Sequence, residues 1–481
     1  MTLTAHSLYE TFTFTSQSQG PQRNFSGFSS RYVRTRKRRK LLWRLLLLLL
    51  LCFVLRTFVI NRHSDTARRG VPPDPNSVAD VPNTATCHPQ SHIVFLKTHK
   101  TASSTVLNIL YRYGESRNLT FALPVGQAMH LFYPKLFESH FVEGFSSGRV
   151  KEFHIMCNHM RFRKAEVAKV MPEDTFYFSI IRHPVTMIES SFSYFKGIPA
   201  FSNSRSLEDF LDNTNNYKDS APWSFLAHNN LAFDFGFDHN VTADADDHED
   251  KAKRAVAAIE RDFHLILVSE YFDESMILLK HVLCWSLEDV VSFKLNSRSN
   301  RTRHQISPNT AEKIKRWNAL DWSLYLHFNA TFWQKVESVV GREQMKSEVS
   351  QLRELQDKLA NTCLKGGGAV DPSQMKDAGL MPAQSGTAVI QGYNLKPDLD
   401  SQTRTQCQRL TTPELQYTER LKSLQFPVQQ KQVLQCVRTA EDGFNEPTSL
   451  ALTEYNWPVT RVMDRPATVH DLFLECVKQC V

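Results

Sequence analysis

Two short segments of the sequence carry cations and hydroxyl groups in places where proteins bind anions. The first, residues 97–105, reads KTHKTASST between an apolar run and a helix-like stretch. Backbone N–H groups at a helix N-terminus point outward, and the helix dipole favours negative charge there. We interpret this turn as a phosphate-binding cradle; a Ser/Thr-capped helix start with surface lysines is the alternative. Its candidate residues are Lys97, Lys100, Thr101, Ala102, Ser103, Ser104 and Thr105.

The second segment, residues 182–192, also follows an apolar run and reads RHPVTMIESSF. Pro184 suits the first turn of a helix, so Arg182 would end a strand and Ser190 would lie two turns into the helix. Ligands bind beyond the carboxyl ends of parallel strands, and the planar fork of arginine matches phosphate. Arg182 and Ser190 therefore predict a second phosphate site. The alternative is a surface arginine and a neutral helix serine.

The elements that must position these residues form an alternating pattern. Helix-like stretches at 106–113, 184–196 and 273–285 each follow an apolar run. Apolar strands that alternate with helices predict an α/β fold, with a parallel sheet flanked by helices and wound by right-handed crossovers. Residues beyond 310 look helical, and 364–400 look like a loop. The strand candidates are 93–96, 153–157, 175–181 and 264–268.

The amino-terminal part of the chain predicts a membrane anchor. Residues 1–40 hold eight of the 57 Lys and Arg residues and one of the 50 Asp and Glu residues, so the net charge of +7 lies in this tail. The other 441 residues carry 49 of each sign, which does not support nucleic-acid binding. Residues 41–60 are long enough to span a bilayer, although a cleaved signal peptide is the alternative. The basic run before them would keep the N-terminus in the cytosol.

We therefore expect a cytosolic tail at 1–40, a transmembrane signal-anchor at 41–60, a stem at 61–90, a core domain at 91–345 and a partly helical, cysteine-containing extension at 346–481. A lumenal body permits disulfides, and eight of the nine cysteines lie beyond the anchor. It also permits N-glycosylation. The acceptor sequons are at Asn118, Asn240, Asn300 and Asn329.

Together the two segments resemble the galactose 3-O-sulfotransferase family, through residues 97–105 and 181–185. Residues 153–162, 267–275 and 317–325 support this resemblance, which covers 90–345 well and 346–430 loosely. It implies the sulfotransferase fold with a P-loop-like turn, in a single-pass type II protein of the Golgi membrane. It also implies sulfuryl transfer to the 3-hydroxyl of a terminal galactose, on a galactosylceramide-like glycolipid or on a glycoprotein glycan.

The implied donor is 3'-phosphoadenosine-5'-phosphosulfate. By the resemblance, the turn at 100–105 would hold the 5'-phosphosulfate, with Lys100 on the leaving oxygen. Arg182 and Ser190, eight residues apart as in sulfotransferases generally, would hold the 3'-phosphate. The generic sulfotransferase turn has glycine at the position of Ala102, whereas galactose-directed members resemble this chain.

The transfer needs a base for the sugar hydroxyl, and histidine is the usual choice near neutral pH. His159 resembles the base of the glycan 2-O-sulfotransferases and ranks first. His99 lies in the cradle and is the second candidate, as base or sulfate ligand. His154 lies within a predicted strand and ranks third, with a role in the core or near the acceptor. Weaker acceptor candidates are Trp223, Asn229 and Glu270, each with packing or helix capping as the alternative.

Other functions fit the sequence less well. It contains no GxxxxGK[ST] motif and no strand-end carboxylate suited to Mg²⁺, which disfavours a kinase or ATPase. No His, Cys or Asp cluster has metal-ligand spacing, so we expect no metal. A lumenal metal-dependent glycosyltransferase would use an Asp-x-Asp site such as 244–246, which lies in an acidic loop. An inactive glycan-binding relative is the other alternative, and a homodimer remains open.

Overall fold

The computed structural model describes residues 87–217 and 221–427. The predicted basic tail, the anchor, most of the stem and the end of the extension lie outside these residues. Among the helices within the described ranges, none combines the length and the hydropathy of a membrane span.

The sheet has four parallel strands in the order β2-β1-β3-β4. Its strands are β1 (Ile93–Leu96), β2 (Ile155–Met156), β3 (Phe176–Ile181) and β4 (Leu265–Val268). All strand residues except Phe176 are buried, because helices cover both faces of a parallel sheet. The predicted parallel sheet is confirmed, although β2 is shorter than the expected 153–157.

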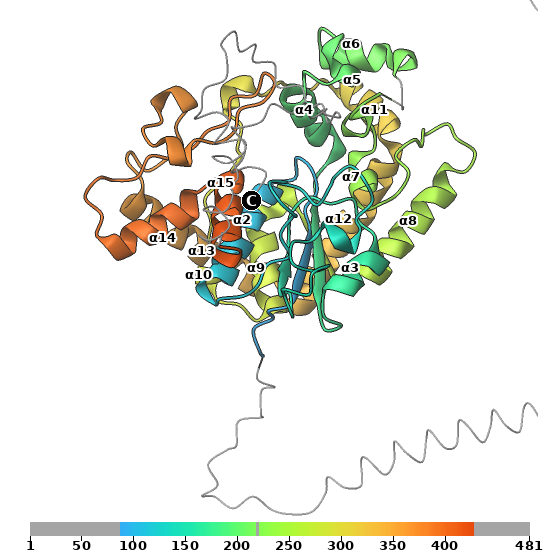
Figure 1. The fold of residues 1–481 in the computed structure, drawn as a ribbon. Coiled ribbons are helices and arrows are strands. Elements are labelled where there is room, and N and C mark those ends of the chain that lie inside the picture. The colour runs from blue at the N-terminus through green and yellow to red at the C-terminus, as the bar shows by residue number, and fades with distance from the viewer. Residues whose placement is uncertain (1–86, 218–220, 428–481) are drawn as a thin grey trace, which may run out of the picture. The chain divides into compact units, whose positions relative to one another are not determined.

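Helices follow three of the strands, as the sequence predicted (Figure 1). They are α2 (Ser103–Ser116) after β1, α4 (Pro184–Tyr194) after β3 and α9 (Phe272–Leu283) after β4. Because all strands run in one direction, the segments that enter these helices meet at the carboxyl edge of the sheet. The phosphate-binding segments predicted at 97–105 and 182–192 therefore lie at the same edge.

The other helices complete the layers around the sheet. The α-helices are α3 (Lys164–Val170), α5 (Pro199–Ser202), α6 (Leu207–Asp212), α7 (Asn230–Asp234), α8 (His248–Asp262), α10 (Leu287–Val290), α11 (Pro308–Trp317), α12 (Ala319–Val339), α13 (Arg342–Cys363), α14 (Ser401–Thr411) and α15 (Glu414–Gln425). The 3₁₀ helices are η1 (Ser139–Phe141), η2 (Thr214–Asn216), η3 (Ser224–Leu226), η4 (Ser269–Tyr271), η5 (Asn300–Thr302), η6 (Pro372–Gln374) and η7 (Ala378–Leu380).

The long helix α12 buries one face against the sheet and its neighbouring helices. Leu324, Phe328, Phe332 and Val336 recur every four residues and are all buried in the main core. This spacing places them on one side of the helix, and α12 contacts β4, α8 and α9. The helical character predicted beyond residue 310 is confirmed.

The carboxyl-terminal extension packs on the core. The boundary expected at residue 345 falls inside α13, and α15 lies against α2 although the two are far apart in sequence (Figure 1). Tyr111 of α2 makes a 2.9 Å hydrogen bond with Thr418 of α15. Residues 364–400 contain only 3₁₀ helices and isolated bridges, as the predicted loop implied.

Two disulfides fasten the described residues. One joins Cys87 to Cys284 near the start of the unit, and the other joins Cys363 to Cys407 across the loop region. Cys157 is a buried free thiol. These pairings could not be read from the sequence.

Three of the four sequon asparagines, Asn118, Asn240 and Asn300, are exposed. The fourth, Asn329, is half-buried in the middle of α12. A helix interior is a poor place for a large attached glycan, so the exposed positions of the first three suit the predicted modification better.

Candidate active site

A cavity of about 1120 Å³ opens at the carboxyl edge of the sheet. The loops after β1, β2 and β3, the η4 turn after β4, and the start of α15 all contribute to its wall. Both predicted anion-binding segments therefore face one space. The sequence-predicted residues that line it are Lys97, His99, Lys100, Thr101, Ala102, Ser103, Ser104, Thr105, His159, Arg182, Ser190 and Glu270.

The turn before α2 has an unusual backbone. Lys100 and Ala102 have positive φ angles of 58° and 66°, in the left-handed region that favours glycine. Alternation of left-handed and right-handed residues turns successive backbone N–H groups toward one concavity, which is how proteins form anion nests. The turn is held from within, because Ser103 Oγ donates to Thr98 O at 2.6 Å and Thr101 and Thr98 join their hydroxyls at 2.8 Å. These hydroxyls build the cradle. The N–H of His99 donates to Asp234 and the N–H of Thr105 donates to Ala102 O, and we expect the N–H groups between them to face an anion.

Lys100 lies in a strongly cationic part of the cavity. Its Nζ is 3.5 Å from the centroid of the Tyr194 ring. Burial, together with repulsion from Arg182, Arg298 and Lys97, lowers the pKa of Lys100 to about 7. A bound anion would offset the cost of burial and the repulsion from the neighbouring cations, and would favour the charged form of Lys100.

Arg182 connects the two anion-binding segments. Its Nη1 donates to Lys100 O at 2.9 Å, and its Nε donates to Thr186 Oγ1 at 3.0 Å. Ser190 lies further along α4 and faces the same cavity. The arginine therefore spans the distance between the turn and the helix that carries Ser190.

Two acidic side chains that line the cavity accept hydrogen bonds from neighbouring residues. Glu189 accepts hydrogen bonds from Arg298 and from the backbone N–H of His304, the latter at 3.0 Å. Glu270 accepts the backbone N–H of His183 at 3.1 Å. Glu270 thus caps the start of α4 beside Arg182, which corresponds to the capping alternative rather than an acceptor contact.

His159 is buried and both of its ring nitrogens are occupied. Nδ1 lies 2.8 Å from Lys97 O, so it donates its proton there, and Nε2 accepts from Lys97 Nζ at 2.9 Å. Burial, followed by the charges of His99 and Lys97, lowers the pKa of His159 well below its usual value. In this arrangement His159 is a neutral acceptor that positions Lys97.

Glu414 holds the other side of Lys97. Its carboxylate lies 3.1 Å from Lys97 Nζ and accepts Ser104 Oγ at 2.8 Å. Burial alone would raise the pKa of Glu414, but Lys97 and Ser104 keep it below its usual value. The first residue of α15 thereby becomes part of the site, 310 residues after Ser104.

His99 has the arrangement of a general base. Its Nδ1 lies 3.0 Å from Asp234 Oδ1, and its backbone N–H donates to Asp234 Oδ2 at 2.8 Å. Tyr133 Oη donates to the same carboxylate at 2.7 Å. A proton on Nδ1 leaves the Nε2 lone pair of His99 available, and Asp234 stabilises the imidazolium that forms.

Three weaker candidates are not brought to the cavity. Asn229 is fully buried, and its amide bridges the 239–241 segment and the first turn of α12. Trp223 packs beside Phe225 and does not line the cavity. His154 precedes β2, so it lies at the amino edge of the sheet, opposite the cavity. None of these three residues lines the described cavity, and a contact between them and an acceptor stays a prediction.

Sequence reasoning missed Asp234 and Glu414. Asp234 lies in the apolar stretch LAFDFGF, and a lone acid in such a stretch signals a buried, partnered carboxylate. Glu414 has no local signal, because its partners come from the other end of the chain. Tyr194, which contacts Lys100, was also missed. It lies one helical turn after the predicted Ser190, so its position in the same helix was the available signal.

The matching family model and the similar known proteins agree on one family. The family model described as galactose-3-O-sulfotransferase matches residues 26–425. Galactose-3-O-sulfotransferase 2 of Sus scrofa is 51% identical over 344 residues, which is 70% of this chain and 85% of that protein. Galactosylceramide sulfotransferase of Homo sapiens is 42% identical, over 69% of this chain and 78% of its own length. Galactose-3-O-sulfotransferase 4 of Bos taurus is 37% identical, over 72% of this chain and 85% of its own length.

Proposed function

Because the chain belongs to the galactose-3-O-sulfotransferase family, we propose that it is an enzyme that transfers a sulfuryl group to the 3-hydroxyl of a terminal galactose on a glycolipid or glycoprotein glycan. One observation carries the proposal. The turn at 97–105 and the segment with Arg182 and Ser190 line one cavity and are joined by the Arg182–Lys100 hydrogen bond.

The donor we propose is 3'-phosphoadenosine-5'-phosphosulfate. It carries anionic groups at both ends, which matches two cationic segments in one cavity. Lys100 and the turn to Thr105 would hold the 5'-phosphosulfate, while Arg182 and Ser190 would hold the 3'-phosphate. The cavity volume of about 1120 Å³ leaves room for the sugar beside the nucleotide.

The reaction is an in-line displacement at sulfur. The galactose 3-oxygen forms a bond to sulfur while the bond from sulfur to the phosphate oxygen breaks, and its electron pair leaves on the phosphate. Lys100 neutralises the charge that develops on this oxygen. His99 Nε2 takes the hydroxyl proton, and Asp234 supports the resulting charge. The contacts thus favour His99 over His159, the reverse of the sequence ranking.

His159, Lys97 and Glu414 act as a support for this chemistry. The Lys97 ammonium lies between a neutral imidazole and a carboxylate, at 2.9 Å and 3.1 Å. This arrangement holds a second cation beside the turn without an excess of buried charge. A sulfonate oxygen that reaches the turn would find Lys97 already oriented.

We also propose a Golgi location, with a lumenal catalytic domain behind a single amino-terminal anchor at 41–60. The two disulfides support an oxidising compartment, because such bonds are rare in the cytosol. The glycosyltransferase alternative receives no support here, because Asp244 and Asp246 lie away from the cavity, and Asp244 contacts Arg316.

The test uses the full-length chain with donor carrying radiolabelled sulfate and a panel of β-galactosides, followed by linkage analysis of the product. We expect label on the 3-oxygen of galactose, with loss of transfer in Lys100→Ala. His140→Asn, at an exposed position away from the cavity, is the matched control and should retain activity. Label elsewhere on the sugar would reject the 3-hydroxyl, and wild-type chain without transfer would favour an inactive glycan-binding relative.

A further inference from the structure

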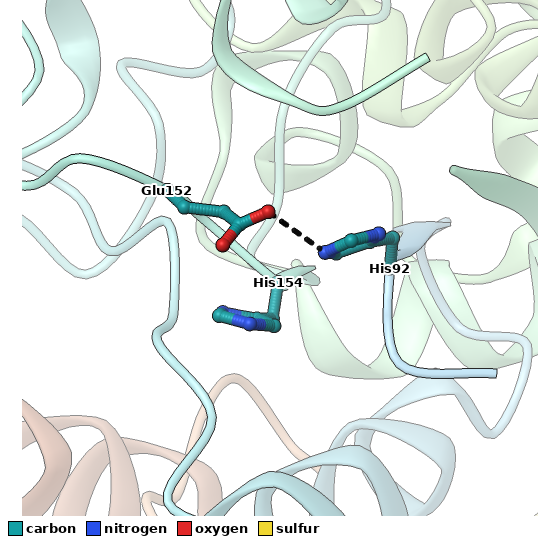
Figure 2. Close-up of side chains that lie close together, drawn as sticks. All are labelled: His92, Glu152 and His154. Atoms are coloured by element: carbon teal, nitrogen blue, oxygen red, sulfur yellow. Dashed lines mark ion pairs between the residues drawn. The ribbon is translucent and has the colours of Figure 1, made fainter. Parts of the chain in front are cut away.

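We propose that His92, Glu152 and His154 form a divalent metal site, best suited to Zn²⁺, at the amino edge of the sheet. One ligand atom from each residue lies within 4.8 Å of the others. Figure 2 shows the carboxylate and the two imidazoles close together, with the His92–Glu152 contact drawn as a dashed line. This site is separate from the cavity, which lies at the carboxyl edge.

The sheet register itself aligns these residues. Ile93 of β1 pairs with Ile155 of β2, so His92 and His154 are neighbours that immediately precede two adjacent strands. The two backbones are joined just there, because Ile93 N donates to His154 O at 2.7 Å. The imidazole rings lie 5.1 Å apart, centroid to centroid. Two potential ligands are thus held where two strands of the sheet pair.

The distances fit a small tetrahedral site. Zinc bonds to imidazole nitrogen and carboxylate oxygen at about 2.0–2.2 Å, so two ligands of one tetrahedral ion lie about 3.3–3.6 Å apart. His92 Nε2 and Glu152 Oε1 are 3.4 Å apart. A ligand atom of His154 lies within 4.8 Å of those of the other two residues, so His154 would be the third protein ligand, and water would take the fourth position. Two imidazoles with one carboxylate is a donor set typical of zinc.

A fourth residue orients the first ligand. Asp174 precedes β3, on the other side of β1, and its Oδ1 lies 2.8 Å from His92 Nδ1. A carboxylate that accepts the proton of one ring nitrogen directs the other nitrogen toward a metal. In this arrangement the Nε2 lone pair of His92 faces the carboxylate of Glu152. Two electron-rich atoms repel each other, and a cation between them would make the contact favourable.

The site is accessible from solvent. The Glu152 and Asp174 side chains are 56% and 67% exposed, whereas His92 is 16% exposed. His154 Nδ1 lies 3.3 Å from the backbone N–H of Thr120, a long hydrogen bond that metal coordination would loosen. A bound ion would tie together the starts of β2 and β1, with β3 joined through Asp174. We therefore assign it a stabilising role.

A protonated His92 between Asp174 and Glu152 is the rival explanation, and metal binding separates the two. The full-length chain is stripped with chelator, dialysed and titrated with ZnCl₂, and bound zinc is counted by mass spectrometry. We expect one zinc fewer per chain in the double variant His92→Asn/Glu152→Gln than in wild type. X-ray absorption at the zinc edge should show two imidazole ligands for that ion.

The matched control is Glu138→Gln/His140→Asn, which removes another His–Glu pair, exposed and 3.3 Å apart, that has no second imidazole. It should keep the wild-type zinc content. Asp174→Asn should weaken zinc binding about 10- to 100-fold and decides the matter if the double variant does not fold. Equal zinc content in wild type and the double variant, or unchanged affinity in Asp174→Asn, would overturn the proposal. None of these readouts depends on sulfuryl transfer.

Discussion

The environment of Lys100 should make nucleotide binding depend on pH. Its pKa of about 7 results from burial and from repulsion by Arg182, Arg298 and Lys97. A bound phosphate raises this pKa, because a nearby anion favours the charged form. The nucleotide site therefore gains a proton when it fills at or above neutral pH.

We predict that the affinity for adenosine 3',5'-bisphosphate falls as pH rises above about 7, by up to about tenfold per pH unit. Below pH 7, Lys100 is already charged in the free enzyme and the dependence on this group disappears. Calorimetry in buffers of different ionisation enthalpy measures the proton uptake directly. Lys100→Arg keeps the charge at every pH and should remove this uptake; a variant with unchanged uptake would contradict the assignment.

His99 and His159, which both line the cavity, are predicted to have different roles. His99→Gln should lower kcat by about 10²–10⁴-fold with little change in nucleotide affinity, because a positioned base contributes that much. Asp234→Asn should lower kcat in the same direction. His159→Gln should affect mainly nucleotide binding, through Lys97. Measured kcat and nucleotide Kd separate these effects, and a larger kcat loss in His159→Gln would restore the sequence ranking.

At the scale of elements, the turn before α2 makes a testable demand on the backbone. Ala102 has a left-handed conformation that costs a non-glycine residue roughly 1–2 kcal/mol. Ala102→Gly should therefore leave the free energy of unfolding unchanged or raise it by about 1 kcal/mol. The matched control is Ala257→Gly on the exposed face of α8, which should lose about 1 kcal/mol. Urea denaturation of both variants compares them, and equal losses would contradict the strained turn.

Helix α15 supplies a partner that the core lacks. Glu414→Gln should lower the free energy of unfolding by about 1–3 kcal/mol, because it weakens charged hydrogen bonds with Lys97 and Ser104. Glu419→Gln, at an exposed position of the same helix, should change it by less than about 0.5 kcal/mol. Denaturant titration checks both values. Equal effects would show that Glu414 contributes no more than a surface charge.

The elements also show what the sequence could and could not predict. The strands were predictable because parallel strands buried on both faces are continuous apolar runs, and the anion sites followed from the strand ends. His154 was predicted to lie within a strand at 153–157, but β2 comprises only Ile155–Met156, so His154 precedes this strand at the amino edge of the sheet. The alternatives for Asn229 stayed open at the sequence level, because an amide that binds backbone groups looks the same there as one that binds a sugar.

At the scale of the whole molecule, the missing information was long-range contact. The His92–Glu152–His154 cluster joins residues about 60 positions apart, and Glu414 reaches Ser104 from 310 positions away. The local hydrophobic periodicity of a sequence does not indicate such contacts. The disulfide pairs depended equally on which helices pack together.

The disulfides provide a prediction for the entire unit. Breaking Cys363–Cys407 by replacing both residues with serine should lower the free energy of unfolding by about 2–4 kcal/mol, since the bond closes a loop of 44 residues. Cys157→Ala, at a buried free thiol, should cost less. Thermal unfolding with and without reductant measures the difference. A wild-type melting temperature insensitive to reductant would contradict this expectation.

The contact between α15 and the turn after β1 has a consequence during protein synthesis. A ribosome adds about 5–20 residues per second, so Lys97 waits roughly 15–60 seconds before Glu414 is made. During that interval the nascent chain can form β1 and α2, but its cationic pocket lacks a wall. Translation that stops ahead of residue 414 would therefore leave a polypeptide with its sheet intact and no finished place for the donor.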